Sequence, residues 1–347
     1  MSQSLKFLIN KSKYKNLNNE ISFLLANSIN TGLTGFKGEN ILFSKTSDID
    51  LYLDYINQNI DKITKLDVKE VFLLDSYHSA TIEGASTSVE DVKKAFINEN
   101  KTKSELMVIN NVKALNYALK EGISENNIRN IWNILVENCC ENETKKGIKY
   151  RDGDVFVASI KKVIHTPCPY DKIEFYMNEL FNYSLRNKLL EICIKHFYFV
   201  YIHPFCDGNG RFARLWSYRD LIENVNNNFK YISISKQINE NLNNYYISLE
   251  ESEFLIDNKM YITTFIEYYL ECICNAINKG LNNNLILSEV EKYLVSKINK
   301  DGITVKKLVN TKYSESTIRN SLNNLVSTGI LYKIKEGNHY KYFKREV

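Results

Sequence analysis

The stretch "HPFCDGNGRFAR" (203–214) concentrates chemically versatile residues in a chain that has few of them. The 347-residue sequence holds thirteen glycines, three prolines and five histidines. Two of those glycines, one proline and one histidine fall within this stretch. The run "RFARLWSYRDLI" that begins inside it is typical of a helix. The sequence therefore predicts a glycine-lined turn that leads directly into a helix.

This turn has the composition of an anion site. Glycines on both sides of Asn209 let successive backbone N–H groups converge on an anion, and a helix start adds unsatisfied donors. Arg211 and Arg214 are three residues apart and share a helical face. Asp207 offers an oxygen ligand to Mg²⁺, and His203 can take up a proton near pH 7. We predict a polyphosphate cradle with a metal ligand and a base, the alternative being a tight turn with solvated charges.

Composition places the chain among ordinary globular proteins. It is 44% apolar and 25% charged, and its formal charge of +4 argues against a protein dominated by nucleic-acid binding. The N-terminus lacks an apolar run of signal-peptide length, and nowhere do eighteen apolar residues follow one another, so we expect a cytosolic protein and no membrane partner. Seven scattered cysteines without a CxxC pair indicate free thiols in a reducing compartment.

Most of the main body is typical of helices. Apolar residues recur at helical spacing in 123–140, and 189–202 and 260–277 are apolar nearly all round. Strand-like alternation is scarce, and its best central case is 154–165, which we interpret as a short hairpin. We therefore predict a mainly α fold with one small β-hairpin, preceded by an N-terminal helical region over 1–70.

The last part of the chain changes character. Helices are predicted over 287–298, 304–310 and 314–329, followed by a hairpin over 330–344 around Gly337-Asn338. This is winged-helix order, assigned to 285–347, with the boundary in "NKGLNNNL" (278–285). Residues 283–347 hold twelve Lys and Arg against six Asp and Glu. The module could bind DNA through "SESTIRNSLNNL" as recognition helix, or serve protein docking or dimerisation.

The stretch 203–214 resembles the complete signature of the Fic family, His-Pro-Phe-x-Asp-Gly-Asn-Gly-Arg-x-x-Arg, without a mismatch. Weaker similarities extend over roughly 70–275, so we assign a Fic-type core to 71–280. "GIKYRDGDVFV" (147–157) is similar to the segment that leads into the family's target-docking flap, and 234–252 to the region that closes over the adenine. Many members carry an acidic residue before the motif where this chain has Val200.

The resemblance implies a protein adenylyltransferase that transfers AMP from ATP to a Ser, Thr or Tyr hydroxyl of a protein, with Mg²⁺. His203 would deprotonate the hydroxyl, Asp207 would hold the metal, and Arg214 would bind the γ-phosphate. The phosphates would also be gripped by Gly208, Asn209, Gly210 and Arg211. Tyr245 and Tyr246 occupy the place where the family surrounds the adenine, although ordinary core aromatics would fit there too.

A second motif, "HSATIEGAS" (78–86), places Ser79 and Glu83 four residues apart. Alone, it reads as a helix end with one solvated carboxylate. Beside the signature it resembles the family's inhibitory motif, Ser/Thr-x-x-x-Glu-Gly/Asn. The resemblance implies auto-inhibition in cis, in which Glu83 pairs with Arg214 and misplaces the phosphates of ATP. The same glutamate could support removal of AMP.

Several alternatives stay open at this point. The core could merely sense nucleotide for a DNA-binding regulator, although an intact His203 argues against that. The enzyme could transfer another phosphate-linked group, such as UMP or phosphocholine. Self-modification and homo-oligomerisation are further partner alternatives. The hairpin could pair with an extended target segment or only cover the core. We interpret His78, His165 and His196 as structural or surface residues.

Overall fold

The computed structural model describes residues 25–140, 149–158, 163–282, 289–298, 302–308, 313–327, 331–336 and 339–344. The chain divides into two compact units, Met1–Ile277 and Asn278–Val347. The fold is mainly α with small sheets, which confirms the predicted fold class. Within the described residues, every helix is too short or too polar to cross a lipid bilayer.

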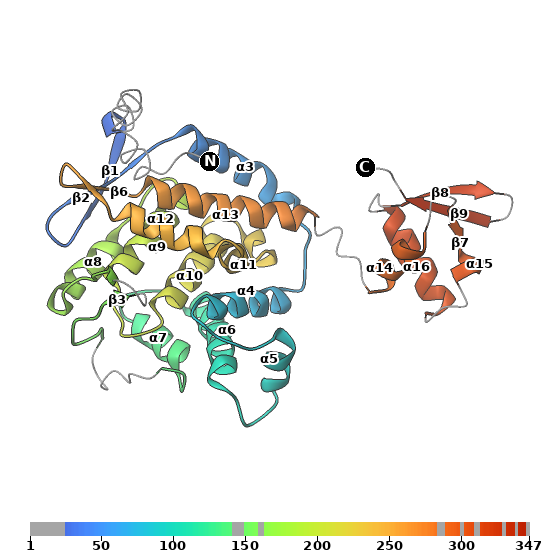
Figure 1. Cartoon of the computed structure of the whole chain (residues 1–347), viewed down its shortest axis with the longest axis horizontal. Helices are drawn as coiled ribbons and strands as arrows, with labels where there is room; N and C mark the ends of the chain where they lie inside the picture. The colour runs from blue at the N-terminus through green and yellow to red at the C-terminus, as the bar shows by residue number, and fades with distance from the viewer. Residues whose placement is uncertain are drawn as a thin grey trace. The chain divides into compact units, whose positions relative to one another are not determined.

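The first unit is a helical body (Figure 1). Two helices form its centre: α9 (Lys188–Ile202) is buried on nearly every side, and α10 (Asn209–Asp220) packs along it, with Phe199 stacked on Phe212. Its other α-helices are α3 (Ser47–Asn59), α4 (Val68–Ile82), α5 (Val89–Ala95), α6 (Lys103–Glu121), α7 (Ile128–Val136), α8 (Ile173–Asn182), α11 (Ile234–Glu240), α12 (Leu242–Ser252) and α13 (Thr263–Asn282). Short 3₁₀ and π turns join them at Ile60–Lys62, Tyr170–Lys172, Leu221–Val225 and Asn227–Tyr231.

A four-stranded sheet corrects the prediction of a helical N-terminal region. Strands β1 (Ser28–Thr34) and β2 (Asn40–Ser44) are antiparallel, and β2 continues in parallel with β6 (Lys259–Tyr261), which pairs with β5 (Leu255–Ile256). The prediction of one β element in the main body was therefore also wrong. Pairing between β2 and β6 joins segments more than two hundred residues apart, so no local pattern could reveal it. Residues 1–24 of the predicted helical region lie outside the described residues.

The predicted hairpin over 154–165 is present at its two described ends. Strand β3 (Val157–Ala158) pairs antiparallel with β4 (Val163–His165), and Val157 lies opposite His165. Residues 159–162 lie outside the described part of the chain. The hairpin precedes α8 and α9 in the chain. Its last residue, His165, also contacts the Tyr201 carbonyl of α9, just before the signature turn.

The second unit has its own core. Helices α14 (Glu289–Lys297), α15 (Val305–Leu308) and α16 (Glu315–Ser327) pack with a three-stranded antiparallel sheet of order β7-β9-β8, formed by β7 (Ile303–Thr304), β8 (Leu331–Glu336) and β9 (His339–Lys344). The short strand β7 was not predicted. The predicted turn at Gly337-Asn338 lies outside the described residues.

Candidate active site

The signature turn joins the centre of the body to the start of α10. Helix α9 ends at Ile202, and His203 caps it in the left-handed conformation (φ 54°, ψ 59°). Gly208 is also left-handed (φ 76°), and α10 begins at Asn209. Phe205 is fully buried and stacks on Trp132 of α7 at 5.1 Å between ring centroids. The indole N–H of Trp132 donates to the Asp207 carbonyl at 2.8 Å, so this residue of α7 contacts the turn at both Phe205 and Asp207.

The Asn209 side chain clips this turn shut. Its Nδ2 donates to the Phe205 carbonyl at 2.8 Å, and its Oδ1 accepts from the Phe205 backbone N–H at 2.9 Å. Asn209 is 2% exposed, so these bonds are shielded from water. The Asn209 side chain therefore shapes the loop, and the phosphate contact predicted for this residue would come from its backbone N–H.

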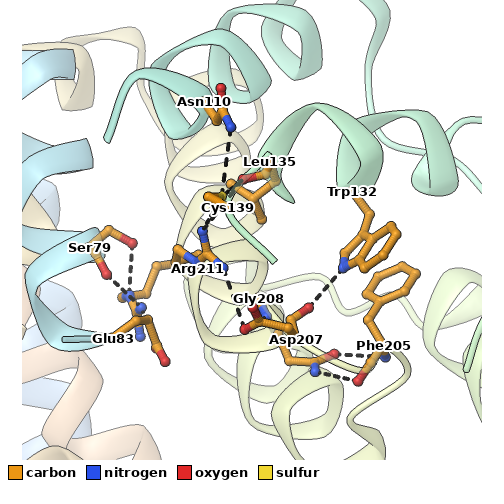
Figure 2. Close-up of polar contacts among 12 residues, drawn as sticks. Ser79, Glu83, Asn110, Trp132, Leu135, Cys139, Phe205, Asp207, Gly208 and Arg211 are labelled. Atoms are coloured by element: carbon orange, nitrogen blue, oxygen red, sulfur yellow. Dashed lines mark hydrogen bonds and ion pairs between the residues drawn. The ribbon is translucent and has the colours of Figure 1, made fainter. Parts of the chain in front are cut away.

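Ser79 and Glu83 approach the head of α10 from one side, while Trp132 and Phe205 lie on the other (Figure 2). Glu83 is the C-cap residue of α4, and Gly84 behind it is left-handed (φ 86°), the conformation that ends helices. A Cβ at Gly210 would lie 2.2 Å from Glu83 Oε1. Only a glycine there leaves room for the carboxylate.

Arg214 is the partner of this carboxylate. Its Nη2 donates to Glu83 Oε1 at 2.7 Å and to the Ser79 carbonyl at 3.0 Å, and its Nε donates to Ser79 Oγ at 3.0 Å. The Arg214 side chain is 1% exposed and that of Glu83 is 33% exposed. Burial disfavours the guanidinium charge, but the Glu83 carboxylate together with Tyr245 and Tyr246 outweighs burial, so the pKa of Arg214 lies above its usual value.

Arg211 turns the other way, toward α7. Its Nη1 lies 3.5 Å from the Leu135 carbonyl oxygen and 3.6 Å from Cys139 Sγ, and its Nη2 lies 3.5 Å from Asp207 Oδ1. Among the described residues, the buried Nε of Arg211 and Nη1 of Arg214 have no hydrogen-bond acceptor. Two desolvated donors next to one turn indicate that an anion completes the site.

Asp207 and the head of α10 fit the expected magnesium–nucleotide pair. The Asp207 side chain is 44% exposed, and its Oδ1 accepts from the Gly208 N–H at 2.5 Å, so its other oxygen is open to a cation. The described residues hold no group of three or more His, Cys, Asp or Glu that could bind a metal by themselves. A single carboxylate beside an anion seat suits an ion that arrives bound to phosphate.

The His203 imidazole is neutral at physiological pH. Its pKa is lowered to about 4, mainly by burial and also by the charges of His165 and Arg151, whereas the Val200 carbonyl and Glu83 oppose the shift. Its Nδ1 lies 3.3 Å from the Val200 carbonyl, which can only accept, so Nδ1 carries the proton. The Nε2 lone pair is therefore free to take a proton from an alcohol.

Arg151, which sequence reasoning did not single out, holds this loop, and His165, interpreted from the sequence as a structural or surface residue, lies beside it. The buried Arg151 donates from Nε to the His203 carbonyl at 2.9 Å, from Nη1 to the Gly153 carbonyl at 2.7 Å and from Nη2 to the Cys168 carbonyl, and its backbone N–H bonds the Pro204 carbonyl. His165 is also buried, and its ring centroid lies 6.4 Å from that of His203. The bond from Arg151 to His203 spans 52 residues and the bond from His165 to Tyr201 spans 36, so no local pattern marks these contacts.

Tyr245 and Tyr246 differ in exposure. Tyr245 is 2% exposed, and its hydroxyl pairs with Nε2 of the buried His196 at 3.0 Å. Tyr246 is 43% exposed, and its hydroxyl lies 3.5 Å from the Ile82 carbonyl at the end of α4. His196 also meets Ser217 Oγ at 2.8 Å, in agreement with its structural interpretation.

Helix α4 is anchored well before its C-terminal end. The buried Asp75 accepts hydrogen bonds from the hydroxyls of Ser233 and Ser235 and from the Ser235 N–H, at 2.8–2.9 Å. Asn239 of α11 contacts His78 at 3.0 Å. These contacts bind α4 to the segment around α11, so Glu83 is presented to α10 by a helix that is fixed along its length.

The segment that contains the signature turn matches a known protein family. Residues 122–219 match the model of the Fic/DOC family. The chain carries a Fic/DOC domain. Over 189 residues it is 30% identical to the protein adenylyltransferase Fic of Nematostella vectensis, a match that covers 47% of this chain and 42% of that protein. The chain thus spans less than half the length of this curated relative.

Solved structures agree on the fold. A Fic family protein from Desulfovibrio desulfuricans G20 superposes with a TM-score of 0.61 at 20% identity, over 87% of this chain and 97% of that one. A Fic domain containing signaling protein from Bacteroides thetaiotaomicron gives a TM-score of 0.51 at 17% identity, over 68% and 96%. At these identities the likeness speaks for the fold alone, and the 203–214 turn lies within the part of the chain that matches the Fic/DOC family.

Proposed function

We propose that this Fic-domain chain is a protein adenylyltransferase that transfers AMP from ATP to a Ser, Thr or Tyr hydroxyl of a protein, with Mg²⁺. The observation that carries the proposal is the meeting, within residues 203–214, of a neutral imidazole and an anion seat with unsatisfied buried donors. The name of the Nematostella relative agrees with this reaction.

In the proposed reaction His203 Nε2 takes the proton of the acceptor hydroxyl, whose oxygen attacks the α-phosphorus. The bond from that phosphorus to the bridging oxygen of the β-phosphate breaks, and pyrophosphate leaves. The head of α10 and Arg214 hold the phosphate chain, and Asp207 holds the metal. When bound, Mg²⁺ neutralises the charge that builds up on the phosphates.

We further propose that Glu83 restrains this reaction. Its carboxylate lies beside Gly210 and bonds Arg214 at 2.7 Å, so it is an anion at the place where a phosphate would lie. A bound nucleotide phosphate would then compete with the Glu83 carboxylate for the Arg214 guanidinium, and the two negative groups would repel each other. Removal of AMP, or transfer of another phosphate-linked group, would use the same residues as AMP transfer. Experiment must distinguish these two reactions from the proposed one.

The test uses Glu83→Gly with Mg²⁺ and ATP labelled at the α- or the γ-phosphate, with and without added lysate protein. We expect label on protein from the α-position only, an intact-mass gain of one adenylate where the chain modifies itself, and loss of both in Glu83→Gly/His203→Ala. Label from the γ-position, or label independent of His203, would overturn the proposal. Competition by UTP distinguishes nucleotide classes.

A second candidate, a nucleotide-sensing DNA-binding regulator, rests on the second unit, which we propose to be a winged helix. Lys306 and Lys307 of α15 and Lys333 and Lys335 of β8 are exposed. Arg319 of α16 is occupied by Glu315 at 2.6 Å. Fluorescence anisotropy of the full chain with a mixed-sequence duplex tests it, with Lys333→Gln/Lys335→Gln expected to weaken binding and Lys94→Gln as control. Absence of salt-sensitive binding removes this candidate.

A further inference from the structure

His165 joins three segments that surround the signature turn. It lies at the end of strand β4, its Nδ1 is 2.7 Å from Glu253 Oε2 next to α12, and its Nε2 is 2.7 Å from the Tyr201 carbonyl near the end of α9. The ring is 7% exposed and the Glu253 side chain 24% exposed. Such short bonds between a buried ring and two oxygen atoms fix the hairpin end against α9.

Both ring nitrogens of His165 face oxygen. The Tyr201 carbonyl only accepts, so Nε2 carries a proton, and an ionised Glu253 carboxylate calls for a second proton on Nδ1. The arrangement is that of an imidazolium paired with a carboxylate. Its positive end lies beside His203, at 6.4 Å between the ring centroids, and the negative end points toward α12.

We propose that His165 is a positioning residue of the reaction, which clamps the hairpin to the end of α9 and faces the catalytic imidazole with a positive charge that resists its protonation. This inference rests on the proposed function, because it assigns His203 the role of base. The other charged groups facing His203 are Arg151, which acts in the same sense, and Glu83, which acts against it.

Two substitutions separate charge from clamping. His165→Gln removes the positive charge and leaves Glu253 behind, so the His203 titration midpoint should rise by about one pH unit. Glu253→Gln keeps the imidazole and its bond to the Tyr201 carbonyl but removes the carboxylate that favours the second proton of His165, so the midpoint should rise here too, by no more than in His165→Gln. A larger rise in Glu253→Gln than in His165→Gln would show that loosening of the hairpin, and not the charge of His165, is responsible.

The titration is measured by NMR on the ring protons of the full chain. The sequence has five histidines, so single substitutions assign every resonance. His339→Gln, on β9 in the other unit, is the matched control and should leave the His203 midpoint in place. An unchanged midpoint in His165→Gln overturns the inference. This readout needs no turnover, so it stands apart from failure of the proposed function.

Kinetics give the second readout. In the Glu83→Gly background, His165→Gln should move the acid limb of the pH–rate profile upward by the same amount, so that activity lost at pH 5 returns at pH 8. A residue that only supports the fold would lower the rate by one factor at every pH. Circular dichroism melts of both variants show that the comparison is between folded chains, and a pH-independent loss of rate contradicts the proposal.

Discussion

Gly210 and Glu83 fit together without space between them: a Cβ on Gly210 would lie 2.2 Å from Glu83 Oε1 and 3.1 Å from Arg214 Nη1. The absence of a side chain at Gly210 therefore leaves room for the Glu83 carboxylate beside Arg214. In the proposed function the same absence would also leave room for the phosphates.

Gly210→Ala should uncouple these two effects. The methyl group pushes the flexible end of Glu83 away and also crowds the phosphate position. We therefore expect Glu83→Gly to activate Gly210→Ala less than it activates the wild-type chain, measured as the initial rate of AMP incorporation. Gly153→Ala is the control, since a Cβ there meets no atom within 4 Å and its backbone is not left-handed. Equal activation in both backgrounds would show that Glu83 does not lie at Gly210.

Glu83→Gly alone should raise the rate of AMP transfer about 10- to 100-fold, the size expected for release of one bidentate-capable arginine contact. The affinity for ATP should change much less than the rate, because the adenine and most phosphate contacts remain. Isothermal titration and initial rates give the two quantities. Glu121→Gly, at the end of α6, removes a carboxylate from a comparable helix end and should have no effect on either.

Ser79→Ala should weaken both the fold and the restraint. The Ser79 hydroxyl accepts from Arg214 Nε at 3.0 Å in a fully buried position, so its loss leaves a charged donor unsatisfied at a cost of about 1–3 kcal/mol. We expect a lower melting temperature and a modest gain in activity. The exposed Ser86→Ala should change neither, and an unchanged melting temperature in Ser79→Ala contradicts the assignment.

The pKa of His203 fixes the acid behaviour of the reaction. Because burial lowers it to about 4, AMP transfer by Glu83→Gly should hold its rate from pH 7 down to about pH 5, where a histidine of ordinary pKa 6.5 would be mostly protonated. An acid limb near pH 6.5 would contradict this.

The same shift has a consequence for stability. Between pH 6.5 and 4 the unfolded chain binds a proton at His203 that the folded chain does not, so the free energy of unfolding falls as the pH drops through this window. His203→Gln should show a shallower fall in urea titrations over the same range. A fall as steep as that of the wild-type chain would place the titrating group elsewhere.

Asp207→Asn should reduce AMP transfer by about 100-fold or more, since a metal ligand contributes several kcal/mol to charge stabilisation. The residual rate should need a higher Mg²⁺ concentration for half saturation, and the Gly208 N–H still finds an acceptor, so the fold survives. Asp171→Asn, on the exposed Tyr170–Lys172 turn, is the control. Unchanged Mg²⁺ dependence would remove Asp207 from the metal site.

The sequence revealed the parts of this molecule whose chemistry is local. Glycines, charges and periodicity within 203–214 predicted a turn at a helix start, and the apolar runs predicted α9 and α13. The Glu83–Arg214 contact followed from resemblance and not from any pattern, because 131 residues separate the two.

What the sequence could not reveal depends on distant pairing. Strand β2 is short and finds its partner in β6, and Arg151 finds its acceptor at His203, 52 residues away. The place of Asn209 between two glycines predicted an anion contact through the backbone, but it gave no sign that the side-chain amide pairs with the backbone of Phe205. Composition gives the residue type at a site, whereas the direction of a side chain is decided by the tertiary structure.

The two hydrogen bonds between Asn209 and Phe205 mean that the loop has its conformation without a bound nucleotide. The Asn209 amide bonds both the N–H and the carbonyl of Phe205, as a neighbouring strand would. Ligand binding therefore does not have to supply free energy to order this loop. Under the proposed function, the rate would therefore depend on whether the Glu83 carboxylate or a triphosphate occupies this preformed loop, and not on ordering of the loop.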